Sequence, residues 1–298
     1  MNIAVAFLAV SALAPLVGQQ APPGQAPRPG TNPFGGPIVL APDDIQVNPE
    51  PPDDINANKD VPHGKLELIA YYSKTVGTTR HMSVYTPPGY VPSRNYPVLY
   101  LLHGIGGDET EWERFAEPNL IEDNLLASGK AVPMIIVMPN GRAQKDDRPG
   151  PNPFATAPAF AAFEADLLKD VIPAIESRYS VKANRDHRAI AGLSMGAGQS
   201  LNFGLAHLQT FSWVGSFSAA PNTKAPAELV PDEQGAAHLK LFYLSAGNKD
   251  GLIRISQGVH RYLKAHGIPH VWNVDGHAHD PTHWRNNLYY FLQDLFKP

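Results

Sequence analysis

The feature that most constrains the fold is a regular alternation of short apolar runs with longer helical stretches, which begins after His63. Continuous apolar runs of this length are typical of strands buried on both faces of a sheet. The pattern therefore predicts a mostly parallel, doubly wound α/β sheet with helices on both faces, in one domain. The expected strands are 66–72, 81–85, 97–102, 134–138, 189–193, 213–217, 239–244 and 271–274, and the expected helices are 119–127, 160–177, 195–208, 253–265 and 283–296.

One G-x-S-x-G motif lies at the carboxyl end of an expected strand, which is where open parallel sheets bind their ligands. It consists of Gly192, Ser194 and Gly196, with the strand ending at Leu193 and a helical stretch beginning at Met195. A strand, a sharp turn and a helix are the setting of the nucleophile elbow of the α/β-hydrolase fold. The alternative is a serine that caps an ordinary helix. The setting favours Ser194 as a nucleophile.

A glycine-rich loop follows the expected strand 97–102 and has the form HG-x-GG, from His103 to Gly107. An α/β hydrolase builds its oxyanion hole from the N–H group after the nucleophile and one from this loop. We therefore expect Met195 and Ile105 to be the two donors. His103 precedes the serine, whereas the base of this fold follows it, so we expect His103 to support the loop.

The base and the acid should follow Ser194 in the order acid, then histidine. Asp250 comes after the expected strand 239–244, at the carboxyl edge of the sheet, and is the candidate acid; a helix cap is its alternative role. His277 and His279 both lie in the loop after 271–274, where the base belongs. In an extended loop their side chains point the same way, so the periodicity does not choose between them.

A metal site is the alternative reading of the late histidines, because His277, His279 and His283 lie within one short segment and could ligate zinc. A nucleophile, a base, an acid and an oxyanion hole already account for ester chemistry, so no metal and no cofactor is expected. The absence of cysteine excludes a thiol nucleophile, a disulfide and a cysteine-ligated metal.

The N-terminal part differs from the rest of the 298-residue chain. Residues 3–17 form an apolar run like that of a secretory signal peptide, which predicts a signal over 1–18 and a secreted protein, extracellular or periplasmic. A mis-assigned start or a buried strand is the alternative, since no Lys or Arg precedes the run. Ten of the 30 prolines lie between Gln19 and Asp60. We expect residues 19–62 to be a linker or a surface arm, mostly unpacked, and 63–298 to be the catalytic domain.

The charge excludes some partners. The net charge is −4 and no run of Lys or Arg occurs, which argues against nucleic acid or, after signal cleavage, a membrane as partner. The oligomeric state is not constrained by these features.

Several motifs together resemble carbohydrate esterase family 1, in particular the feruloyl esterase domains of bacterial xylanases. The resemblance covers roughly residues 63–297. The motifs are VYTPPGY at 84–90, YPVLYLLHGIGG at 96–107, HRAIAGLSMGAGQS at 187–200, SAAPNT at 218–223, G-x-x-D at 247–250 and HD-x-x-x-W at 279–284.

The resemblance implies a triad of Ser194, Asp250 and His279, with Asp280 and Trp284 following the histidine as in the family's motif. Gly106, Asn140 and Trp284 are candidate substrate-binding residues. The implied activity is a serine carboxylester hydrolase that releases ferulate or related hydroxycinnamates from feruloylated polysaccharide such as arabinoxylan. An acetylxylan esterase acting on acetylated polysaccharide, or a secreted acyltransferase, is the alternative on the same triad.

Overall fold

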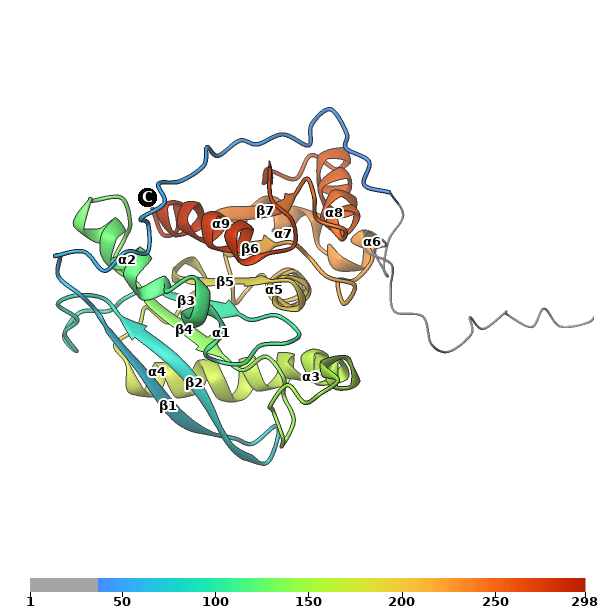
Figure 1. The fold of residues 1–298 in the computed structure, drawn as a ribbon. Helices are drawn as coiled ribbons and strands as arrows, with labels where there is room; N and C mark the ends of the chain where they lie inside the picture. Colours follow the sequence, from blue (N-terminus) through green and yellow to red (C-terminus); the bar gives the residue numbers. More distant parts are fainter. Residues whose placement is uncertain (1–36, 298) are drawn as a thin grey trace, which may run out of the picture. The chain divides into compact units, whose positions relative to one another are not determined.

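A computed structural model describes residues 37–297, and the apolar run at 3–17 lies outside this part of the chain. Its centre is one eight-stranded sheet in the order β1-β2-β4-β3-β5-β6-β7-β8 (Figure 1). β1 and β2 are antiparallel to their neighbours, and β3 to β8 are parallel. The strands are β1 (Lys65–Ser73), β2 (Thr78–Thr86), β3 (Val98–Leu102), β4 (Ile135–Pro139), β5 (Arg188–Leu193), β6 (Trp213–Phe217), β7 (Leu241–Gly247) and β8 (Val271–Asp275). The predicted α/β sheet is confirmed.

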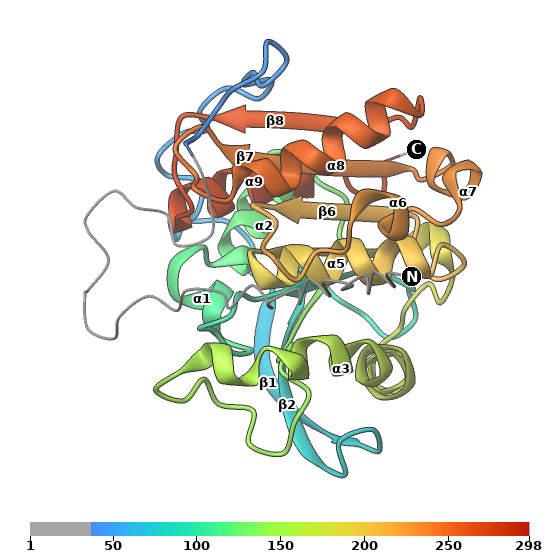
Figure 2. The same cartoon turned by 90° about the vertical axis from the view of Figure 1, so that its right-hand side faces the viewer.

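Helices cover both faces of the sheet, because alternate residues of each buried strand point to opposite sides. Tyr100 of β3 belongs to a core on one face, and Leu99 and Leu101 belong to a core on the other. The first core is closed by α3 (Pro158–Asp166), α4 (Ile172–Arg178), α5 (Met195–Ala206) and α8 (Ile253–Ala265), and the second by α1 (Glu111–Phe115), α2 (Pro118–Ala127) and α9 (Pro281–Asp294). Figures 1 and 2 show both layers.

The helix expected at 160–177 is interrupted. A single wide turn, Leu167–Val171, joins α3 to α4, with the Ile172 N–H bonded to the Leu167 carbonyl five residues earlier. Pro173 has no N–H group and cannot complete the regular ladder at this point, which accounts for the wider turn. Three short helices had no clear sequence pattern: α1, α6 (Pro226–Leu229) and α7 (Glu233–Ala237).

The described residues that precede β1, 37–62, are called the arm below. The arm runs along the outer edge of the sheet, past α8 and α9, to reach α2 and then β1 (Figure 1). The carbonyl of Ile45 accepts a hydrogen bond from the N–H of Val274 in the edge strand β8, at 2.9 Å. The side chain of Ile55 is only 3% exposed and belongs to the core that α2 and α9 close. Of the two expectations for 19–62, the described part therefore fits a surface arm rather than a free linker: most of its side chains stay at least partly exposed, but it is bonded to the edge strand and buries Ile55. Covering an edge strand also protects its free backbone groups from pairing with another chain.

Candidate active site

The turn at Ser194 is strained, and glycines on both sides make it possible. Ser194 has φ 51° and ψ −116°, between the end of β5 and the start of α5. A β-carbon on Gly196 would lie 2.5 Å from the carbonyl oxygens of Leu102 and His103, and one on Gly192 would lie 2.5 Å from Gly196. Only glycine fits at either position, and a non-glycine residue with positive φ in such a turn costs about 1–3 kcal/mol. The turn holds the Ser194 hydroxyl above the carboxyl edge of the sheet.

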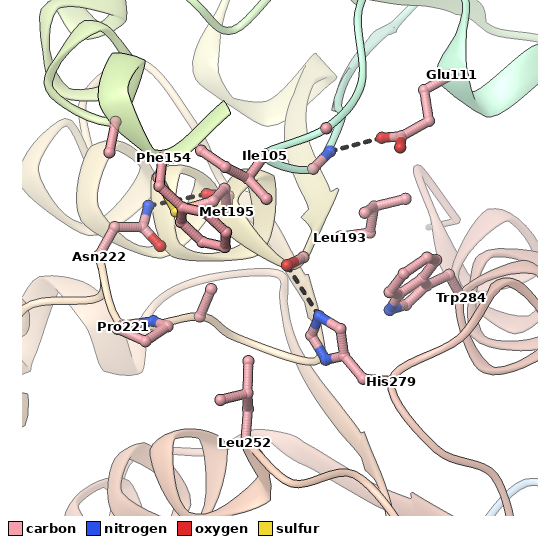
Figure 3. A pocket seen from close by; sticks show the side chains of 15 residues that line it. Ile105, Glu111, Phe154, Leu193, Met195, Pro221, Asn222, Leu252, His279 and Trp284 are labelled. Carbon is pink, nitrogen blue, oxygen red and sulfur yellow. Dashed lines mark hydrogen bonds between the residues drawn. The ribbon is translucent and has the colours of Figure 1, made fainter. Parts of the chain in front are cut away.

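A chain of hydrogen bonds joins the three residues predicted to be the triad. The Oγ of Ser194 lies 2.9 Å from Nε2 of His279 (Figure 3). Nδ1 of His279 lies 3.0 Å from Oδ2 of Asp250. Asp250 follows β7, and His279 follows β8. With Nδ1 protonated and donating to the carboxylate, Nε2 is free to accept the hydroxyl proton.

The environment of Asp250 keeps it ionised. Its side chain is 1% exposed, and burial alone would raise its pKa. Hydrogen bonds from His279 and from the Leu252 N–H, the latter at 2.7 Å, outweigh burial and hold the pKa of Asp250 below its usual value. A charged carboxylate is therefore present to orient His279 and to stabilise the imidazolium.

The loop 276–280 directs its two histidines differently. His277 turns outward, where its Nε2 lies 3.1 Å from Oε2 of Glu50 in the arm, while His279 turns to Ser194. The expectation that both side chains point the same way is wrong, because the loop bends: Asp280 accepts a hydrogen bond from the Ala278 N–H at 3.1 Å and caps α9.

His283, the third histidine of this segment, bonds to neither Glu50 nor Ser194. Its Nδ1 lies 2.7 Å from Oδ2 of Asp275 and its Nε2 lies 3.1 Å from Oγ of Ser245, in the same atomic order as at Ser194. Ser245 and His283 are both 0% exposed, and Asp275 is 3% exposed. Within 37–297 no group of three or more His, Asp or Glu side chains is placed to hold a metal ion.

The two expected oxyanion donors come from the ends of neighbouring strands β3 and β5. Met195 is the first residue of α5, so its N–H has no acceptor within the helix. The carbonyl of Gly104 accepts hydrogen bonds from Nδ1 of His103 at 2.7 Å and from the Gly107 N–H at 3.2 Å. Because the C=O and N–H of one trans peptide point in opposite directions, these bonds turn the Ile105 N–H away from His103.

His103 supports the loop, as expected. It is 1% exposed, and burial lowers its pKa, so the ring is neutral. Its Nε2 accepts from the Gly141 N–H at 2.8 Å, which leaves the proton on Nδ1 for Gly104.

Two further residues hold the same loop and were not predicted from the sequence. Arg142, 0% exposed, donates to the carbonyls of Ile105 and of Gly107, the latter at 3.1 Å. Glu111, at the start of α1, accepts from the Gly104 N–H at 2.7 Å. Arg142 is a single charged residue in a loop, and Glu111 is one in a short helix. Neither belongs to a sequence motif, so no pattern identified them.

A cavity of about 530 Å³ opens beside Ser194 and is mostly apolar (Figure 3). Gly106 and Trp284, two of the candidate substrate-binding residues, line it, and the Trp284 ring stands edge-to-face against His279 with centroids 5.2 Å apart. Asn140 does not line the cavity. It is 0% exposed, donates to the Asp147 carbonyl at 3.0 Å and accepts from the Arg142 N–H at 3.0 Å. Its predicted role in binding substrate is therefore corrected to support of the loop that carries Arg142.

The comparison with known families agrees with this geometry. The esterase family model matches residues 73–287, which include the elbow, the glycine-rich loop and the loop of His279. The chain belongs to the esterase family. It is a carboxylic ester hydrolase of the α/β-hydrolase fold, related to carbohydrate esterase family 1.

Named relatives are similar over most of this esterase. An endo-1,4-beta-xylanase/feruloyl esterase of Xylanibacter ruminicola is 33% identical over 247 residues, which are 80% of this chain and 32% of that protein. The chain thus spans about a third of that relative's length. Within 37–297, no helix of this esterase combines the length and apolar character needed to cross a membrane.

A solved structure has the same architecture. The CE1 ferulic acid esterase of the anaerobic fungus Anaeromyces mucronatus superposes with a TM-score of 0.75 at 28% identity, covering 85% of this chain and 98% of that one. A second structure of the fungal enzyme, in complex with ferulic acid, has a TM-score of 0.74 at 27% identity, with the same coverage of both chains.

Proposed function

We propose that this esterase releases ferulate and related hydroxycinnamates from plant cell-wall polysaccharide, in particular arabinoxylan. The observation that carries the proposal is the cavity of about 530 Å³ beside Ser194. Phe154, Pro221 and Leu252 are among its walls, and such apolar surfaces suit a planar phenolic acyl group. An acetyl group would fill only a small part of it. The names of the bacterial and fungal relatives support the same substrate class.

The proposed first step is acyl transfer to Ser194. Its Oγ attacks the ester carbonyl carbon while the hydroxyl proton passes to Nε2 of His279, whose Nδ1–H remains bonded to Asp250. The carbonyl oxygen becomes an oxyanion that accepts hydrogen bonds from the N–H groups of Ile105 and Met195. The C–O bond to the sugar then breaks, and the sugar oxygen takes the proton from His279.

Water completes the cycle. His279 accepts a proton from the incoming water, whose oxygen attacks the acyl carbon of the acyl-serine. A second oxyanion forms in the same hole and collapses, and the Ser194 oxygen leaves with the proton from His279. The products are the free sugar hydroxyl and the hydroxycinnamic acid, and no cofactor enters any step.

We further propose that the enzyme acts outside the cytoplasm, extracellularly or in the periplasm. The apolar run at 3–17 and the insoluble nature of a cell-wall polysaccharide support this proposal.

Substrate comparison tests the proposal. The values of kcat/KM for methyl ferulate, an aryl acetate and acetylated xylan should rank methyl ferulate first, and Ser194→Ala should lower kcat by about 10⁴- to 10⁶-fold. A clear preference for acetylated xylan would favour the acetylxylan esterase instead. Acyl transfer to an added alcohol in preference to water would favour the acyltransferase.

A further inference from the structure

The loop that carries His279 is held from outside by the arm. Oε2 of Glu50 accepts from Nε2 of His277 at 3.1 Å and from Nδ2 of Asn286 in α9 at 2.9 Å. Oε1 of the same carboxylate accepts from Nε2 of Gln46 at 3.1 Å. Glu50 thus ties together the arm, the loop and the helix that follows the loop.

The arm is fixed to the sheet immediately before Glu50. The N–H groups of Val47 and Asn48 donate to Oδ1 of Asn273 in β8, at 2.9 and 3.2 Å. Nδ2 of Asn48 donates to the hydroxyl of Tyr243 in β7 at 2.8 Å. These bonds, together with that between Ile45 and Val274, set the position of Glu50 relative to the strands from which the loop emerges.

His277 connects the acid to the base. Its carbonyl accepts from the Lys249 N–H at 2.9 Å, in the turn that leads to Asp250. Its own N–H donates to Oδ1 of Asp275 at 3.1 Å. Gly247 packs so closely that a β-carbon there would lie 2.2 Å from the His277 carbonyl oxygen. A displacement of His277 would therefore move the loop that carries His279 relative to Asp250.

We propose that residues 45–50 of the arm form a clasp on the loop 276–280, and that Glu50 is a positioning residue for His279. The inference rests on the proposed esterase mechanism, in which His279 is the base. Glu50 does not touch the substrate cavity. Its loss frees the side chain of His277 and lets the imidazole of His279 leave its productive orientation, which lowers the chemical rate more than substrate binding.

The experiment compares two arm carboxylates of the same chemistry in the full chain. Asp43, which lies in the arm just before residues 45–50, bonds to His260 at 3.0 Å and Lys264 at 2.5 Å on α8. Glu50→Ala should lower kcat for methyl ferulate about five- to tenfold with KM changed less than about twofold, because misorientation of a base affects the reacting step. Asp43→Ala should lower Tm and leave kcat unchanged.

Two further variants separate positioning from general loss of packing. His277→Ala should lower kcat about as much as Glu50→Ala, and the double variant should be no slower than either, because both remove the bond between Glu50 and His277 on which the clasp depends. Glu50→Gln should restore much of kcat, since its amide oxygen still accepts from Asn286 and His277. An unchanged kcat in Glu50→Ala, or an equal loss in Asp43→Ala, would overturn the clasp.

Hydrogen exchange gives a readout that does not depend on ester hydrolysis. The amides of His277 and Ala278 donate to Asp275 and Asp280, so the clasp predicts faster exchange of both in Glu50→Ala but not in Asp43→Ala. Equal exchange in wild type and Glu50→Ala would contradict it. If wild type failed to cleave methyl ferulate, the proposed function would be at fault, and the exchange result would still decide on the clasp.

Discussion

Two histidines in one loop, His277 and His279, differ in their partners, and this difference separates their expected effects on catalysis. His279→Ala removes the residue that bonds both Ser194 and Asp250, so kcat should fall by about 10⁴-fold or more. His277→Ala removes only the bond to Glu50 and should cost about tenfold or less. Steady-state kinetics on methyl ferulate measures both. The reverse order would place the base at His277.

A pair of helix glycines tests the steric argument for the elbow. Gly196→Ala places a methyl group 2.5 Å from two backbone oxygens, and overpacking of this kind costs about 1–3 kcal/mol or more in the free energy of unfolding. Gly258, in α8, has nothing within 4 Å of the corresponding position. Gly258→Ala is the matched control and should stabilise by up to about 1 kcal/mol. Urea unfolding compares the two, and equal values would disprove the close approach at Gly196.

Residue types in the expected chain order were enough to propose Ser194 and Asp250, because the fold fixes where each one must follow a strand. They placed the base at His277 or His279, and only the family resemblance favoured His279. The partner of a charged side chain is instead decided by tertiary packing. Arg142 and Glu111 hold the glycine-rich loop 103–107 through contacts that no spacing reveals. Asn140 was misjudged for the same reason, since a loop residue facing the cavity and one facing the protein interior look alike in sequence.

At the level of elements, β3 to β8 were predictable because each is a short, mostly apolar run buried on both faces. Short helices such as α1 have too few turns to show a recognisable spacing of apolar residues. Because α1 was not predicted, the position of Glu111 at its start was not predicted either. The arm was predicted only in part. Its prolines suggested an extended, unpacked segment, and it is extended, but its backbone and polar side chains find partners along β8 that composition does not reveal.

Removal of the arm should therefore be costly. A chain that begins at Pro62 loses the buried side chain of Ile55, worth about 1.5–3 kcal/mol, besides the bonds to β8. For a domain of this size we expect Tm to fall by at least about 5 °C. A chain that begins at Pro37 keeps the arm and is the control. Differential scanning calorimetry measures the Tm of both chains, and equal Tm values would contradict this expectation.

For the molecule as a whole, buried carboxylates set the response to acid. The pKa values of Asp250 and Asp275 are lowered: burial opposes ionisation, but hydrogen bonds from His279 and His283 outweigh it. A carboxyl group with a lower pKa in the folded state than in the unfolded state contributes stability above its unfolded pKa of about 4. That stability is lost as the pH falls below about 4 and through the folded-state values.

Unfolding in urea at a series of pH values from about 6 to 3 should show this loss as a decline in the free energy of unfolding. Asp275→Asn removes one of the groups and should flatten the decline, while lowering stability at neutral pH because the buried hydrogen bond between the Asp275 carboxylate and His283 is weakened. An unchanged slope in this variant would show that Asp275 does not contribute.

The buried bonds among Ser245, His283 and Asp275 repeat the atomic order of the active site, with Ser245 in β7, two strands away from the end of β5 at Ser194, yet no reagent can enter there. Accessibility, rather than the presence of the three side chains, therefore distinguishes a reactive serine from an inert one in this chain. A fluorophosphonate probe should label the wild-type enzyme once and the Ser194→Ala variant not at all, as peptide mass mapping would show. A search for the arrangement of serine, histidine and aspartate would find two sites in this chain, at Ser194 and at Ser245. A search for reactive serines should find only Ser194.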